Sequence, residues 1–400
     1  MKHESKGDAG EDYVNNLAYK SYLKYWCYPN PKDITGDKKE ICDLLIIFRD
    51  VLLIISVKNH TFDGNYERYK KRVIEKSSNQ LNGAERKLFN SSRDIFIKHP
   101  DREQELFNPK IYTKIFKITI NVGEQFEFYD LGDKKEYKGI INILNKESFE
   151  RIIQELNTIH DFTDYLQERE KLLQSYKHIA FNCSESDLLA IYLRNVRKFP
   201  TEFYNAGTEK ISLNLKGEWQ KYNSDDRVKL KRDEDKYSYF IDNLVQTDVL
   251  PLPNGEMLAK ELMALRRTER RFISKALLTL IAKYHKDPET EFARRYLEYN
   301  GFGYLMIYYS KTVTNQKDLD LLIFEIAPAL YAYMRNCQEK QIIVLAGNDY
   351  LKQWKFGFFV APELPYTPEA IRHLENLKAS LGWFTNMKGF VYKENEYPEK

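Results

Sequence analysis

An acidic and a basic side chain interrupt two neighbouring apolar runs near the start of the chain. The first run covers residues 39–48 and contains Asp43, and the second covers residues 51–58 and ends with Lys58. This pattern predicts two adjacent buried strands joined by a short turn at residues 49–50. A charge inside such a run costs several kcal/mol unless it is paired or holds a metal, so Asp43 and Lys58 require an explanation.

Phosphodiester hydrolysis is the chemistry that suits this pair. A carboxylate at a strand end can hold a divalent metal ion, which polarises a phosphoryl group and acidifies a bound water. A lysine on the neighbouring strand can position that water or neutralise the charge that develops. The alternative is a structural ion pair between Asp43 and Lys58, and the two strands alone leave both interpretations open.

Two further segments accompany the strand pair. Glu11 lies in the segment Gly10-Glu11-Asp12-Tyr13-Val14, which is expected to open a helix, and Gln80 lies in a helical segment at residues 79–85. Together with Asp43 and the later Ser56-Val57-Lys58, this order resembles the PD-(D/E)xK, or restriction-endonuclease-like, nuclease superfamily. The resemblance covers the first quarter to third of the chain. It implies an α/β fold with a mixed sheet flanked by helices.

The resemblance also implies roles for these residues. Asp43, Glu11 and the Val57 carbonyl would hold Mg2+ or Mn2+, Lys58 would position the hydrolytic water, and Gln80 would orient the phosphate or Lys58. Without the resemblance, Glu11 is an acid in the first turn of a helix and Gln80 is a solvated helix residue.

Ser56 departs from the family pattern, which places an acid two residues before the lysine. A hydroxyl is a far poorer ligand for a hard cation than a carboxylate. Another carboxylate must therefore substitute, with Glu11 first, then Glu40 and Glu75, or the site is inert. The alternative to an active nuclease is a catalytically inert domain that still binds nucleic acid.

Basic residues follow the proposed site along the chain. Residues 66–110 contain eleven Lys or Arg against seven Asp or Glu. Their side chains could track a phosphate backbone, although a solvated helix face is an equally good interpretation. The candidates for nucleic-acid binding are Lys70, Lys71, Arg72 and Lys76.

A second basic cluster lies in the carboxy-terminal half, at Arg266, Arg267, Arg270 and Arg271. It could grip phosphate, but salt bridges to Glu261 and Glu269 across helical turns are the favoured interpretation.

Composition limits the other function classes. With 62 basic and 59 acidic residues, the formal charge of +3 argues against binding nucleic acid by bulk charge, so any binding surface must be local. The four cysteines form no zinc-ligand or disulfide pattern, which favours a reducing cytoplasm. No apolar run approaches eighteen residues, and we expect neither a signal peptide nor a membrane partner.

Periodicity divides the chain into three expected regions: a nuclease domain at 1–135, a helical region and connector at 136–255, and an α/β accessory domain at 256–400. In the first region we expect helices at 11–28 and 66–89, and strands at 114–122 and 125–129. Helices are expected at 146–156, 161–176, 185–195, 261–281, 318–336 and 368–381, and strands at 304–309, 341–346 and 354–360.

The sequence thus favours a metal-dependent nuclease that acts on DNA rather than RNA, the choice of DNA resting on analogy with the superfamily. A role as a bacterial anti-phage defence effector fits that resemblance, and a protein partner or a homo-oligomer is compatible with it. The alternatives are a catalytically inert nucleic-acid binder and a scaffold component of a defence complex.

Overall fold

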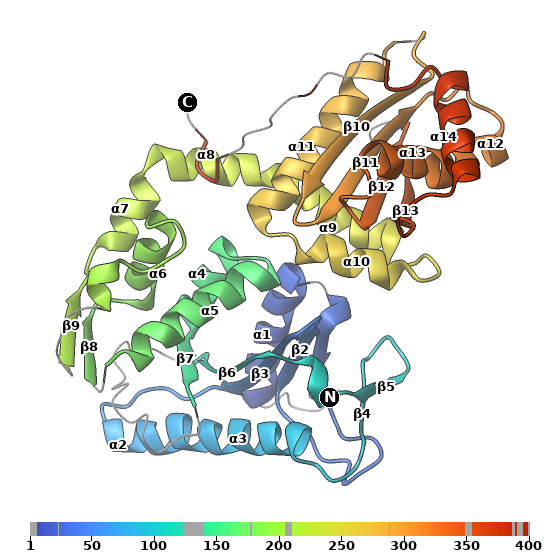
Figure 1. The fold of residues 1–400 in the computed structure, drawn as a ribbon. Helices are drawn as coiled ribbons and strands as arrows, with labels where there is room; N and C mark the ends of the chain where they lie inside the picture. The colour runs from blue at the N-terminus through green and yellow to red at the C-terminus, as the bar shows by residue number, and fades with distance from the viewer. Residues whose placement is uncertain are drawn as a thin grey trace. The chain divides into compact units, whose positions relative to one another are not determined.

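The computed structural model describes residues 6–22, 24–123, 139–176, 178–204, 210–287, 289–348, 354–385, 389 and 395–398 (Figure 1). These residues form two compact units. Unit 1 comprises residues 1–229 and 264–267, and unit 2 comprises 230–263 and 268–400. The expected middle region at 136–255 is therefore shared between the units. No helix in the described part of the chain is both long enough and apolar enough to cross a membrane.

Unit 1 is built on a mixed five-stranded sheet in the order β1-β2-β3-β6-β7. The first three strands pair antiparallel, whereas β3, β6 and β7 run parallel. The strands are β1 (Cys27–Pro29), β2 (Leu44–Phe48), β3 (Val51–Lys58), β6 (Lys114–Asn121) and β7 (Ile141–Asn145). β3 lies in the centre and is buried along almost its whole length, as its unbroken apolar run predicted.

Helices flank this sheet and account for most of the rest of unit 1. They are α1 (Lys6–Tyr22), α2 (Tyr66–Tyr69), α3 (Lys76–Phe89), α4 (Lys146–Glu155), α5 (Ile159–Gln174), α6 (Glu185–Arg194) and α7 (Glu218–Ser224). A π-helical turn at Lys70–Glu75 joins α2 to α3, so one long helix covers the predicted range 66–89. Leu81, Ala84 and Leu88 of α3 share a core with Leu52 and Ile54 of β3.

Short strands complete unit 1. β4 (Ile95–Lys98) and β5 (Gln104–Phe107) form a hairpin, and β8 (His178–Asn182) pairs in parallel with β9 (Lys210–Asn214). None of these four strands was predicted. The predicted strand at 125–129 lies outside the described residues.

The amino-terminal helix differs from its prediction. The sequence indicated a helix over 11–28, but α1 begins at Lys6 and ends at Tyr22, and residues 27–29 form β1. Cys27 and Tyr28 are almost fully buried against the sheet, and Pro29 lies on an edge strand, where its missing N–H costs no ladder hydrogen bond. Tertiary pairing therefore outweighs the helical pattern here.

Unit 2 contains a four-stranded sheet in the order β10-β11-β12-β13, in which β11 and β12 are parallel and the two outer pairings are antiparallel. The strands are β10 (Phe292–Tyr299), β11 (Phe302–Tyr309), β12 (Gln341–Gly347) and β13 (Lys355–Val360). The last three confirm predicted strands, whereas β10 was missed. The helices are α9 (Tyr239–Leu244), α10 (Gly255–Ala264), α11 (Arg267–Tyr284), α12 (Gln316–Leu321), α13 (Ala327–Met334) and α14 (Pro368–Ser380), with α8 (Asp226–Asp235) at the boundary of the units.

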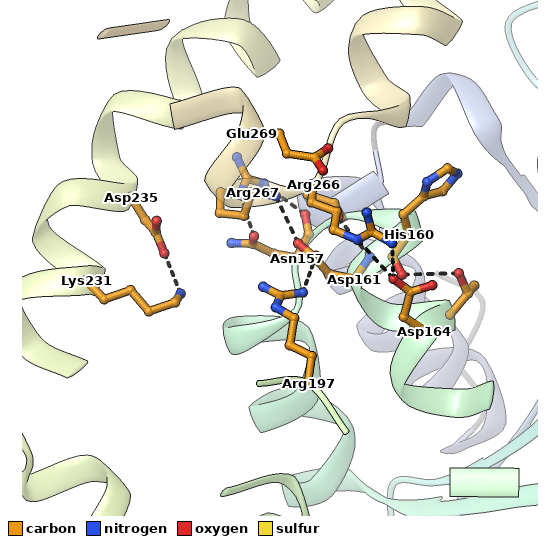
Figure 2. Close-up of polar contacts among 12 residues, drawn as sticks. Asn157, His160, Asp161, Asp164, Arg197, Lys231, Asp235, Arg266, Arg267 and Glu269 are labelled. Carbon is orange, nitrogen blue, oxygen red and sulfur yellow. Dashed lines mark hydrogen bonds and ion pairs between the residues drawn. The ribbon is translucent and has the colours of Figure 1, made fainter. Parts of the chain in front are cut away.

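A buried carboxylate, Asp161 of α5, organises polar contacts inside unit 1 (Figure 2). It accepts an ion pair from Arg197 and a hydrogen bond of 3.0 Å from the backbone N–H of Arg267. The Arg267 guanidinium in turn donates to the Asn157 side chain at 2.6 Å. Burial would raise the pKa of Asp161, but Arg197 and the hydrogen bonds outweigh it and lower the pKa to about 2.

The arginine cluster forms ion pairs with aspartates that are distant in the sequence. These ion pairs join Arg266 to Asp164 in unit 1, and Arg270 to Asp242 and Arg271 to Asp235 in unit 2. Glu269 accepts a hydrogen bond from Tyr299. Three of the four arginines are almost completely buried, so they make contacts inside the fold and are not available to bind phosphate.

We predict that Asp161→Ala lowers the free energy of unfolding by about 3–5 kcal/mol, because it leaves the Arg197 charge buried without its partner. Chemical denaturation measured by circular dichroism tests this. Asp164→Ala is the matched control on the same helix, since its pair with Arg266 is 32% and 40% exposed and should contribute under about 1 kcal/mol. Equal losses in the two variants would contradict the central role of Asp161.

Candidate functional site

Asp43 lies immediately before β2 and is only 8% exposed. The antiparallel register pairs Leu44 with Ile55, which brings Ser56 and Val57 of β3 beside the Asp43 carboxylate. The Ser56 hydroxyl donates to Asp43 Oδ2 at 3.2 Å, and the Val57 backbone N–H donates to the same oxygen. Neighbouring strands thus satisfy a carboxylate that would be costly to bury alone.

Lys58 ends β3 and turns back towards the same carboxylate. Its Nζ lies 3.7 Å from Asp43 Oδ2, and it donates to Ser56 Oγ at 2.6 Å and to the Val57 carbonyl at 2.9 Å. Burial lowers the pKa of Lys58, Asp43 opposes that change, and the nearby Lys76 ammonium adds to it. Asp43 and Lys58 therefore meet, as the sequence predicted.

Gln80 reaches this group from helix α3. Its Oε1 accepts a hydrogen bond of 3.4 Å from the Ser56 hydroxyl, so Ser56 lies at the centre of the contacts among Asp43, Lys58 and Gln80. The position follows from the packing of α3, because Leu81 and Ala84 bury one side of the helix and leave Gln80 on the open side.

Two more carboxylates lie close to Asp43. Burial, the Asp43 charge and a hydrogen bond with Asp43, and then the Glu11 charge, raise the pKa of Glu40 to about 7. With its amide turned to satisfy both polar ends, Asn30 donates to Glu11 Oε2 at 3.3 Å and to the Asp43 carbonyl at 2.9 Å. Glu40 and Asp43 therefore interact directly, and Glu11 lies beside them. Glu75, the third substitute considered, does not line the pocket described next.

A pocket of about 360 Å³ opens beside these residues. Its walls come from the segment before β2, from β3 and from α3. The lining residues are Glu40, Ile41, Cys42, Asp43, Ser56, Asn79, Gln80, Leu81, Gly83, Ala84 and Lys87. The pocket thus has a carboxylate wall, and a helical wall that carries two amides and a lysine.

The oxygen atoms around Asp43 meet some of the requirements of a divalent-cation site. Within the ranges that the structure describes, no three His, Cys, Asp or Glu side chains form a ready metal-binding group. Burial raises the pKa of Glu40, and repulsion from the Asp43 and Glu11 charges adds to this increase. A divalent cation would relieve the same repulsion, and Asp43, Glu40 or Glu11, and the Val57 carbonyl would be its ligands.

The four basic residues predicted to bind nucleic acid differ in solvent exposure. Lys71, Arg72 and Lys76 are exposed, whereas Lys70 is half-buried. Of these, Lys76 acts on the pKa of Lys58 and so lies nearest the site. A basic residue outside the candidate set, Lys87, lines the pocket and pairs with Asp37 at 2.6 Å.

Sequence reasoning missed Asn30, Asn79 and Gly83 as residues of the site, and considered Lys87 only as one of several side chains that could track a phosphate backbone. Gly83 and Lys87 could have been placed here by following the face of the predicted helix that carries Gln80, because they are three and seven residues from it. Asn30 lies in the loop between β1 and β2, and it carries no periodic signal.

Comparisons with protein-family models, with curated proteins and with solved structures gave no match to this chain. The functional conclusion therefore depends on the geometry of the site.

Proposed function

We propose that unit 1 is a restriction-endonuclease-like domain and that the protein is a divalent-metal-dependent nuclease acting on DNA. The observation that carries this proposal is the convergence of Asp43, Lys58 and Gln80 around Ser56, from two strands and a helix. A mixed sheet flanked by helices is compatible with the resemblance. The defence role suggested by the same resemblance is the setting we propose for such an enzyme.

Glu40 supplies the carboxylate that Ser56 lacks. Its side chain interacts with Asp43 directly, whereas Glu11 acts on Glu40 and Lys58 through its charge. We therefore place Glu40 ahead of Glu11 as the second metal ligand, with Glu11 as an additional source of negative charge. When bound, Mg2+ or Mn2+ would polarise the phosphoryl group and acidify a water.

The remaining side chains act directly on the substrate. Lys58 is held by Ser56 and the Val57 carbonyl, so its ammonium is fixed where it can neutralise charge on a phosphate oxygen or orient a water. Gln80 keeps its amide N–H group available for the phosphate, because the hydrogen bond from Ser56 uses its oxygen. Lys71, Arg72 and Lys76 would contact the DNA backbone beyond the cut site.

An inert nucleic-acid binder is the second candidate. It is favoured by one observation, that the described side chains form no ready group of three metal ligands. In that case Asp43 and Lys58 are a structural pair, and the basic side chains of α3 retain the affinity for DNA. Strongly salt-dependent binding without cleavage would identify this function.

Asp43→Asn and Lys58→Met should each lower the rate of Mg2+-dependent plasmid cleavage by at least about a hundredfold, because each removes a charge that the transition state requires. Asp94→Asn and Lys98→Met, at exposed positions of unit 1, are the matched controls and should cleave normally. Circular dichroism would verify folding. Full activity of either site variant would rule out the proposed site.

A second prediction separates the candidate ligands. Glu40→Gln should weaken Mg2+ binding, measured by calorimetry, by about tenfold or more, whereas Glu11→Gln should have a smaller effect. Adding Ser56→Glu to Glu40→Gln should restore part of the affinity, because residues two apart on a strand share a face and residue 56 lies beside Asp43. In the otherwise unchanged protein, Ser56→Glu should be neutral or harmful, since it adds like charge. Wild-type affinity in Glu40→Gln would instead assign the ligand to Glu11.

The raised pKa of Glu40 also predicts a pH dependence of stability in EDTA. Since the folded protein holds this proton more tightly than the unfolded chain, the contribution to stability is complete below pH 4.5 and is lost as pH rises to about 7. Glu40 is only partly buried and solvent screens its charge, so we expect a loss of under about 1 kcal/mol. Denaturation of wild type and Glu40→Gln from pH 4 to pH 8 would test this. Parallel pH profiles would contradict it.

A further inference from the structure

Gly83 occupies a position in the middle of α3 that does not need a glycine for folding. Its backbone is helical, and a Cβ built there meets no atom within 4 Å. Neither an unusual backbone angle nor close packing therefore explains the residue. Glycine in a helix costs about 0.5–1 kcal/mol relative to alanine, so the fold would gain from a side chain at this position.

The space beside Gly83 is the pocket that reaches Asp43 and Ser56. Asn79, Gln80, Gly83 and Lys87 follow one another along α3 at spacings of one, three and four residues, so they form one wall. The amides can donate and accept hydrogen bonds, and Lys87 adds a positive charge. A Cβ at Gly83 would project into this open space.

We propose that this pocket takes one nucleoside of a single-stranded DNA segment, beside the phosphate that Lys58 contacts. This inference rests on the proposed function and names the substrate form on which the same site acts. Gly83 leaves room for the base or sugar, and Asn79 offers hydrogen bonds to a base edge.

The size and chemistry of the pocket favour a nucleoside over a duplex. A volume of about 360 Å³ lies near the lower end of the roughly 300–1,000 Å³ typical of small-molecule pockets. Bases within a duplex are stacked and paired, so an enzyme that takes a base into a pocket must use a single strand or extrude the nucleotide. The carboxyl and amide groups of the wall suit the donors and acceptors of a base edge, and Lys87 supplies a positive charge for a phosphate.

Binding in EDTA tests the inference without cleavage. The probes are a fluorescein-labelled single-stranded DNA, the same chain with every base removed, and the corresponding duplex. The full-length protein should bind the base-bearing single strand at least about tenfold more tightly than the abasic chain, because only the base can fill the pocket and bond to its amide wall; tenfold corresponds to about 1.4 kcal/mol. Equal affinity for these two probes, or tighter binding of the duplex, would overturn the proposal.

Substitutions at Gly83 provide the structural test. Gly83→Leu should abolish most of the preference for the base-bearing strand while leaving affinity for the abasic chain unchanged, and it should maintain or raise the melting temperature. Gly83→Ala, which adds one methyl group, should reduce the preference for the base-bearing strand by a smaller factor. This variant provides the test if Gly83→Leu fails to fold. Arg86→Leu is the control, since Arg86 is exposed on the same helix and outside the pocket. This substitution should lower the affinity for the base-bearing and abasic strands by the same factor.

The outcomes distinguish this inference from the proposed function. Base-dependent binding that is lost in Gly83→Leu, in a protein without Mg2+-dependent cleavage, would support the pocket and refute the nuclease. Mg2+-dependent cleavage without base-dependent binding would support the nuclease and refute the pocket. An unchanged preference in both Gly83 variants would refute the pocket.

Discussion

The burial of Asp43 constrains the whole amino-terminal site. A carboxylate that is 8% exposed must find donors, and its donors are the Ser56 hydroxyl, the Val57 N–H and the Lys58 ammonium. All three belong to β3, so they reach Asp43 only in the register that β2 and β3 adopt. A shift of one residue would turn each of these side chains to the other face of the sheet. The tight turn that sets this register includes Arg49, whose φ of 54° matches the twist of a short hairpin.

The distribution of charge explains how the site tolerates a serine at position 56. Ser56 donates to Asp43 and accepts from Lys58, so a neutral hydroxyl bridges the two charges. The additional carboxylate stands on the segment before β2, where Glu40 interacts with Asp43. With Glu11 nearby, the negative charge exceeds what Lys58 balances, and this excess adds to the effect of burial in raising the pKa of Glu40. A bound cation would act at the same point, so proton and metal would compete for these carboxylates.

Sequence patterns predicted those site residues whose positions are set by a single strand or helix. Asp43 and Lys58 were found because two apolar runs fix strands and strand ends, whereas Gln80 was singled out only by the resemblance of its helix to one in the nuclease superfamily. The role of Glu40 depends on the loop after β1, where an isolated bridge joins Lys32 to Glu40, and this long-range pairing leaves no periodic signal. The sequence favoured salt bridges for the arginine cluster, but it gave no signal for the aspartates Asp164, Asp235 and Asp242, which lie far from the cluster along the chain.

The π-helical turn at Lys70–Glu75 determines which side chains α3 presents to the pocket. Buried positions along this helix are Tyr69, Val73, Ile74, Ser77, Ser78, Leu81, Ala84 and Leu88. The series from Tyr69 through Val73, Ser77, Leu81 and Ala84 to Leu88 takes five turns and advances nineteen positions along the chain, whereas five turns of an ideal α-helix advance about eighteen, so one position is in excess. The wider turn absorbs that residue, and both halves of the helix can bury their apolar side against the sheet. Without it, the second half would be rotated by about 100° relative to the first, and either the core or the wall formed by Asn79, Gln80, Gly83 and Lys87 would be lost.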